Sequence, residues 1–134
     1  MTTVQLIEYE QADAAVRAVY DDIRATRKTD FINNFWKALA HNPDQLKRTW
    51  ESAKAVMAPG ALDPMTKELI YIAVSVANSC EYCIHSHTAA ARAKGMSEAQ
   101  YAELLAVIGL AHHTNGLVAT LQVEVDEIFK VQGP

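Results

Sequence analysis

Apolar residues recur at helical spacing along most of the chain. Residues 12–28 carry Val16, Val19, Tyr20 and Ile23 on one face and charged residues on the other. Comparable apolar faces span residues 31–40, 43–58, 64–79, 80–94 and 98–113. We expect the Asn-Gly pair at 115–116 to break or bend the last of these before a C-terminal helix over the apolar segment 117–130. The pattern predicts an all-α bundle of about six helices.

Signals for helix starts support this division. Asn42 and Asp63 each precede a proline, which is the order expected of an N-cap and the first helical position. Ser97 is followed three positions later by a glutamine, as in a capping box. Asn78 or Ser79 is the predicted cap of the helix that follows residue 80.

One segment also permits a strand. Residues 70–76, IYIAVSV, are rich in β-branched and aromatic side chains. A strand followed by CxxC at the start of a helix is the thioredoxin arrangement. Against it, the segment begins with a helix-start signal at Asp63, contains the polar pair Lys67-Glu68, and has no further strands with which to form a sheet. We therefore interpret it as a helix.

Length and charge narrow the class of protein. The 134 residues suit a single domain over 1–134, and a net charge of -4 without a basic cluster gives no reason to expect nucleic acid as a partner. No uninterrupted apolar run approaches the roughly 18 residues of a membrane span, and the first residues lack the pattern of a secretory signal. We expect a cytoplasmic protein with no membrane partner. Reducing conditions there argue against a purely structural disulfide.

The stretch NSCEYCIHSH holds the chain's two cysteines and two of its histidines. On a helix at 100° per residue, Cys80, Cys83 and His87 share one face, while His85 lies on the far side. One helix cannot aim all four side chains at a single zinc ion. A Cys-Cys-His site completed by a residue from elsewhere stays open, and so does thiol chemistry.

Thiol chemistry fits this placement. The reactive species is the thiolate, and a helix N-terminus lowers the pKa of a cysteine through its unpaired N–H groups. His87 is one turn from Cys83, where it can take a proton, and Cys80 is one turn away on the other side. The pair can therefore form a disulfide with little backbone movement.

Glu68 is the other candidate for the site. Its helix is apolar on nearly every side, and a carboxyl buried there needs a partner or a raised pKa. A raised pKa would suit a group that passes protons near pH 7. The alternative is an exposed first-turn residue that is favoured only by the helix dipole. The sequence leaves both open.

Together these residues are similar to a known family, the AhpD-like alkylhydroperoxidases of the carboxymuconolactone decarboxylase superfamily. Its signature is a glutamate, eleven residues, then CxxCxxxH, and Glu68, Cys80, Cys83 and His87 match every spacing. The likeness covers roughly residues 35 to 125. One position departs, because the family pattern has a histidine between the cysteines where this chain has Tyr82.

The resemblance implies an enzyme that reduces hydroperoxides through a Cys80–Cys83 disulfide. Cys83 would be oxidised by the peroxide, Cys80 would resolve it, and Glu68 and His87 would relay protons to the thiols. A dithiol or a redox protein would supply electrons, and neither a cofactor nor a metal would be required. Family members associate, so we expect a homo-oligomer, either a dimer, a trimer or a hexamer.

Three other functions remain to be tested. The chain could be a disulfide reductase for a partner protein, or a metal-binding or structural member of the fold. The superfamily's decarboxylase or lactone chemistry is disfavoured, because that chemistry has no use for two thiols. Of the remaining aromatic and histidine residues, we expect Trp36 and Trp50 to lie in the core or at a subunit contact. His112 and His113 are expected on a helix, one packed and one solvated.

Overall fold

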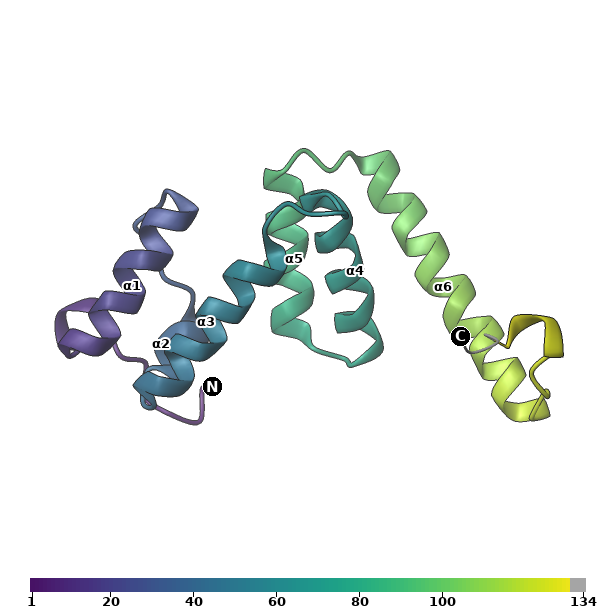
Figure 1. Cartoon of the computed structure of the whole chain (residues 1–134), viewed down its shortest axis with the longest axis horizontal. Coiled ribbons are helices and arrows are strands. Elements are labelled where there is room, and N and C mark those ends of the chain that lie inside the picture. The colour runs from purple at the N-terminus through teal and green to yellow at the C-terminus, as the bar shows by residue number, and fades with distance from the viewer. Residues whose placement is uncertain (131–134) are drawn as a thin grey trace. The chain divides into compact units, whose positions relative to one another are not determined.

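The protein consists of helices joined by short turns, as shown by a computed structural model that describes residues 1–130 (Figure 1). No strand occurs in this range, so the predicted all-α fold is confirmed and the thioredoxin alternative is wrong. The six α-helices are α1 (Ala14–Arg27), α2 (Asn34–Leu39), α3 (Pro43–Met57), α4 (Pro64–Ala77), α5 (Glu81–Ala93) and α6 (Glu98–Leu121). Two single 3-10 turns lie at Tyr9–Gln11 and Glu127–Phe129.

The chain forms two compact units, one from Met1 to Ala58 and one from Pro59 onward. The first contains α1, α2 and α3, and the second contains α4, α5 and α6. The expectation that residues 1–134 act as one domain stays a prediction.

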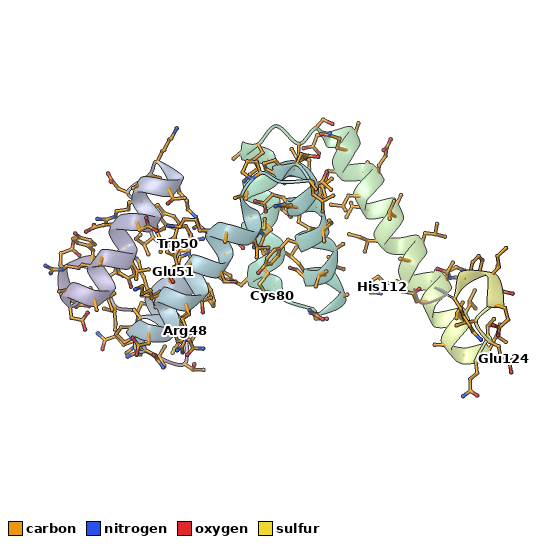
Figure 2. The ribbon with its side chains drawn as sticks, viewed as in Figure 1. Arg48, Trp50, Glu51, Cys80, His112 and Glu124 are labelled. Atoms are coloured by element: carbon orange, nitrogen blue, oxygen red, sulfur yellow. A yellow bond between two sulfur atoms is a disulfide. The ribbon has the colours of Figure 1, made fainter. Side chains whose placement is uncertain are left out.

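The first unit has an aromatic core. Trp36 of α2 and Trp50 of α3 are both buried and meet edge to face, with ring centroids 5.5 Å apart. Trp50 is labelled in Figure 2. The Trp50 indole N–H donates to Asp22 of α1 at 2.6 Å, which ties α3 to α1. Tyr20 and Leu46 are fully buried beside them. The placement of both tryptophans in a core confirms one of the two expectations for them.

The second unit is built on a helical hairpin. α4 and α5 lie side by side, and their shared core holds Ile72 and Ala91 together with Met96 from the turn after α5 (Figure 1). The first turns of α6 add Tyr101 and Leu104, both partly buried. Burial of this small core fixes which faces of α4 and α5 meet, and therefore which polar side chains are brought together.

The predicted helix starts are largely correct. Asn42, Asp63 and Ser97 are the N-caps of α3, α4 and α6, and each side chain accepts a backbone N–H three residues later. Ser97 also forms the complete capping box with Gln100. The cap of α5 was predicted wrongly: Asn78 ends α4, and Cys80 itself is the N-cap.

The predicted break at Asn115-Gly116 is also wrong. α6 runs unbroken from Glu98 to Leu121, and Gln122 ends it in a left-handed conformation, with φ of 49°. A single glycine costs a helix only about 1 kcal/mol relative to alanine, which a 24-residue helix tolerates. Residues 123–126, predicted to continue a helix, are not helical.

α6 carries apolar residues on every side and is mostly uncovered. None of its residues is buried, and Leu105, Val107, Leu110, Leu117, Val118 and Leu121 are each about half or more exposed. Among residues 1–130 it is the one helix long and apolar enough to cross a membrane, judged by length and composition only. No uninterrupted apolar run marks this helix in the sequence, because polar residues at 112–115 divide it.

Candidate active site

The two cysteines lie at the N-terminus of α5. Cys80 is the N-cap, its sulfur accepts the Cys83 backbone N–H at 3.3 Å, and the two sulfurs form a disulfide. Their Cα atoms are 5.3 Å apart, and both residues are partly exposed. Ser79, with φ of 54°, makes the sharp turn from α4 into this cap. The helix N-terminus thus provides the electrostatic setting that favours a thiolate.

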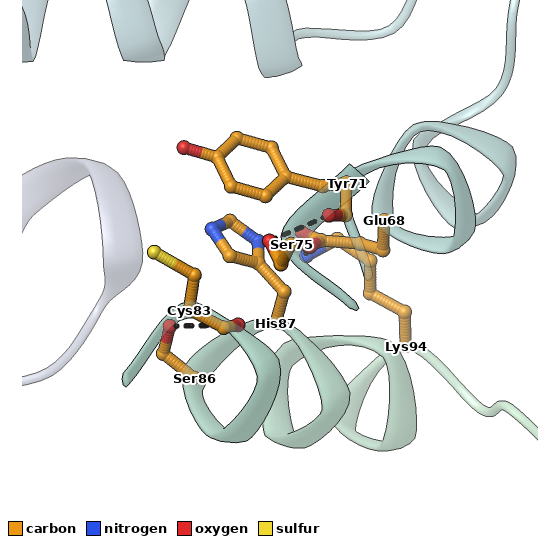
Figure 3. A network of polar contacts seen from close by, with 7 residues as sticks. All are labelled: Glu68, Tyr71, Ser75, Cys83, Ser86, His87 and Lys94. Atoms are coloured by element: carbon orange, nitrogen blue, oxygen red, sulfur yellow. Dashed lines mark hydrogen bonds and ion pairs between the residues drawn. The ribbon is translucent and has the colours of Figure 1, made fainter. Parts of the chain in front are cut away.

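His87 lies one turn after Cys83 on the same face of α5. Its Nδ1 is 2.7 Å from Oε2 of Glu68. A carboxylate only accepts hydrogen bonds, so Nδ1 carries the proton and donates it, and Nε2 is the other nitrogen of the ring. Figure 3 shows the Cys83 sulfur on the side of the ring that faces away from Glu68. His87 is therefore oriented by the carboxylate and presents Nε2 toward the cysteine.

Glu68 is buried on α4, with 4% of its surface exposed. It accepts from His87 through one oxygen and from Lys94 Nζ through the other, at 2.9 Å (Figure 3). Burial raises the pKa of the Glu68 carboxyl, but the hydrogen bonds from His87 and Lys94 outweigh burial, so the pKa is lowered from its ordinary value of 4.5. The exposed first-turn interpretation is wrong, and so is a raised pKa.

Two residues of the site were not assigned to it from the sequence. Lys94 ends α5 and reaches back to Glu68. Tyr71, one turn after Glu68, stacks on the His87 ring with centroids 3.5 Å apart and planes 19° from parallel. Tyr71 follows Glu68 by three positions on an otherwise largely apolar helix, and this polar spacing is a signal that could have identified it. Lys94 gave no signal, because its contact depends on how α5 folds back along α4.

Other candidates lie away from the thiols. His85 is exposed on the far side of α5, as its helical position predicted. Tyr82, between the cysteines, is 43% exposed. His112 of α6 instead lines a cleft of about 370 Å³ with Ala73 and Ala77 of α4 (Figure 2). Ala73 is about 140° around α4 from Glu68, so this cleft opens on a different face from the thiol site.

The site combines a disulfide-bonded cysteine pair with a hydrogen-bonded histidine–glutamate pair. Within residues 1–130, no three histidine, cysteine or acidic side chains are grouped to hold a metal. A thiol at a helix N-terminus, an imidazole facing it and a buried carboxylate behind the imidazole are the components of nucleophilic thiol catalysis with acid–base assistance. The structure brings Cys80, Cys83, His87 and Glu68 into one site, while their catalytic roles stay predictions.

Both the sequence and the fold of this chain are similar to those of known proteins. Residues 43–124 match the model of the carboxymuconolactone decarboxylase family. The crystal structure of an alkylhydroperoxidase AhpD core from Rhodospirillum rubrum is similar over 98% of this chain and 99% of that chain, with 60% identity and a TM-score of 0.92.

Two curated proteins are also similar to this chain. An alkyl hydroperoxide reductase AhpD from Solibacter usitatus is 42% identical over 72% of this chain and 55% of its own length. A protein of the cox locus of Paracoccus denitrificans is 39% identical over 55% of this chain and 71% of its own length. The chain thus spans little more than half of the Solibacter protein. Taken with the shared fold and the matched motif, these similarities show that the chain belongs to the AhpD-like branch of the carboxymuconolactone decarboxylase family.

Proposed function

We propose that this protein is a thiol-dependent oxidoreductase that reduces hydroperoxides by way of the Cys80–Cys83 disulfide. The observation that carries the proposal is the buried Glu68 hydrogen-bonded to His87 at 2.7 Å, with His87 on the same helix face as Cys83. A structural disulfide has no need of a buried, oriented base. The relatives named as alkyl hydroperoxide reductases support the class of reaction.

In the first step, Nε2 of His87 takes the Cys83 proton and the thiolate attacks one peroxide oxygen. The O–O bond breaks, Cys83 becomes a sulfenic acid, and the alcohol leaves with the proton returned by His87. In the second step, the Cys80 thiol attacks the Cys83 sulfur, forming the disulfide and releasing water. An external dithiol then reduces the disulfide by exchange, so each turnover converts one hydroperoxide and one dithiol into an alcohol, water and a disulfide.

The anionic Glu68 supports the first step by stabilising the imidazolium that forms on His87. Because the pKa of the Glu68 carboxyl is lowered by its two donors, it is ionised throughout the neutral range and does not itself exchange protons there. In this mechanism Glu68 orients His87 and compensates its charge, while His87 moves the proton.

A thiol count tests this function. The reduced protein, treated with one equivalent of a hydroperoxide, should lose both thiols and yield one equivalent of the alcohol, and metal analysis of the same sample should show no stoichiometric zinc. If both thiols remain and the same sample reduces a protein disulfide, the result would refute the peroxidase function and support a disulfide reductase. Stoichiometric zinc together with thiols protected from oxidation would refute both of these functions and support a metal site.

We further propose that α6 is covered by a second copy of this chain. A helix with apolar residues exposed on every side belongs in an interior or a membrane. His112, His113, Thr114 and Asn115 occupy four successive positions about 100° apart, and therefore place polar groups around the middle of the helix. Such groups are costly at the centre of a bilayer, whereas a protein partner can hydrogen-bond them.

Light scattering during gel filtration tests the association. Leu110 and Leu117 are 63% and 51% exposed, so changing both to glutamate should leave the fold of one copy intact. We expect the wild type to elute as an oligomer and the double variant as a monomer. Ser52→Glu, which adds a charge on exposed α3, is the control and should remain oligomeric. A monomeric wild type would refute this proposal.

A further inference from the structure

Glu68 is a buried anion with two cationic or potentially cationic partners. Lys94 Nζ is 2.9 Å from one carboxylate oxygen, and His87 Nδ1 is 2.7 Å from the other. A lysine is charged throughout the neutral range. The carboxylate is therefore already paired with a positive charge when His87 is neutral, and His87 needs only to donate an ordinary N–H to it.

Without Lys94, His87 would be the remaining partner of the carboxylate. Buried charges persist only when they are paired and hydrogen-bonded. A carboxylate 4% exposed would then hold the imidazole in its protonated form to a higher pH. The pair would therefore retain one extra proton to a higher pH than it does with Lys94 in place.

The charged and titratable groups around His87 come from two helices. α4 supplies Glu68 and the stacked Tyr71, and α5 supplies Cys83 and Lys94. Near the turn into α6, Arg92 forms a separate ion pair with Glu98 at 3.6 Å and lies over the Tyr101 ring. Lys94 is thus the cation that directly contacts the Glu68–His87 pair from the opposite side.

We propose that Lys94 is the counter-ion that keeps Glu68 compensated while His87 is neutral, and that it thereby sets the pH at which His87 takes up a proton. Lys94 is a positioning residue, since it acts on His87 only through Glu68. The consequence for catalysis rests on the proposed function, because it matters only if His87 serves Cys83. The electrostatic statement itself can be tested without any turnover.

The test is an NMR titration of the oxidised protein, in which the disulfide removes the titration of both thiols. His87 is one of five histidines, and its imidazole signal is identified by its loss in His87→Gln. We expect Lys94→Met to move the midpoint of the His87 titration upward by about one pH unit, the lower end of the range for a nearby charge, since Lys94 acts across a carboxylate.

Two variants separate this effect from a general change in charge. Arg92→Met removes the same unit of charge from the same helix end, and should leave the His87 midpoint within about 0.2 pH units, as expected of an exposed, screened charge. Lys94→Arg keeps a cation that reaches Glu68 and should restore the wild-type midpoint. If Lys94→Met melts below the titration temperature, Lys94→Gln serves in its place, with the same expectation.

An unchanged midpoint in Lys94→Met, or an equal rise in Arg92→Met, would overturn the assignment. A rise in Lys94→Met alone upholds it, even in a protein whose thiols prove inert to hydroperoxide, a result that would refute only the proposed function. Conversely, peroxide-driven loss of both thiols with no change in the His87 midpoint would uphold the function and refute the role of Lys94.

Discussion

Glu68→Gln is the change that most directly tests the relay. The amide keeps the shape of the side chain, but it is neutral and has one acceptor oxygen in place of two. We expect that oxygen to stay on His87 Nδ1, since the amide NH2 then faces Lys94, which is 41% exposed and can turn to water. Helix content should be unchanged, while the imidazolium loses the charge that stabilises it.

The size of the effect follows from the geometry. Two unit charges about 4 Å apart attract by about 4 kcal/mol at an effective dielectric constant of 20. Each 1.36 kcal/mol is a factor of ten in rate, so the upper limit is about a thousandfold. His87 is 23% exposed and Lys94 offsets part of the carboxylate charge, which both reduce the effect. We expect thiol oxidation at pH 7 to slow by roughly ten- to a thousandfold.

Stopped-flow measurement of thiol loss after mixing the reduced protein with hydroperoxide provides the assay. Glu98→Gln, which removes a carboxylate that is 84% exposed, is the control and should react at the wild-type rate. His87→Gln should be slowed to a comparable extent, and the double variant only slightly more, because members of one relay are not additive. A wild-type rate in Glu68→Gln would show that the carboxylate contributes nothing to the chemistry.

Three further outcomes are expected. Cys83→Ser should abolish trapping of a sulfenic acid by a dimedone-type probe, whereas Cys80→Ser should leave a trappable sulfenic acid on Cys83; the reverse pattern would exchange their roles. Because the pKa of Glu68 is lowered in the folded state, its contribution to stability is complete above the ordinary value of 4.5 and is lost as pH falls through the folded value. The difference in unfolding free energy between wild type and Glu68→Gln, measured by urea denaturation, should therefore shrink below that pH, and a constant difference would contradict the ion pairing. Trp50→Ala should destabilise the first unit by about 3–5 kcal/mol, because the ring is 4% exposed and packed edge to face; a loss below 1 kcal/mol by the same method would contradict its role in the core.

Local signals in the sequence predicted local structure well. Asn42, Asp63 and Ser97 were identified as caps because a cap depends only on its neighbours in the chain. Cys80 was not, since sulfur is a weak acceptor and is not counted among the usual capping side chains. The break expected at Asn115-Gly116 failed because propensity is summed over a whole helix, and one glycine is a small part of that sum.

The site was predictable only in part, because some of its contacts join residues that are far apart in the sequence. The shared face of Cys80, Cys83 and His87 follows from helical spacing alone. The contact of Glu68 with His87 joins residues 19 apart, and its contact with Lys94 joins residues 26 apart, so both depend on how α4 and α5 pack. The matched family spacing pointed to the first contact. Nothing in the local sequence pointed to the second.

The hydrogen bond from the Cys83 amide to the Cys80 sulfur links the oxidation state of the pair to the stability of α5. A charge-assisted hydrogen bond is roughly twice as strong as a neutral one, so this cap is strongest when reduced Cys80 is ionised to its thiolate. Ionisation of reduced Cys80 therefore strengthens the first turn of α5, and by thermodynamic linkage the helix favours the ionised dithiol over the disulfide. The cap thus shifts the thiol–disulfide equilibrium slightly toward the reduced form, which is the form that reacts with an oxidant.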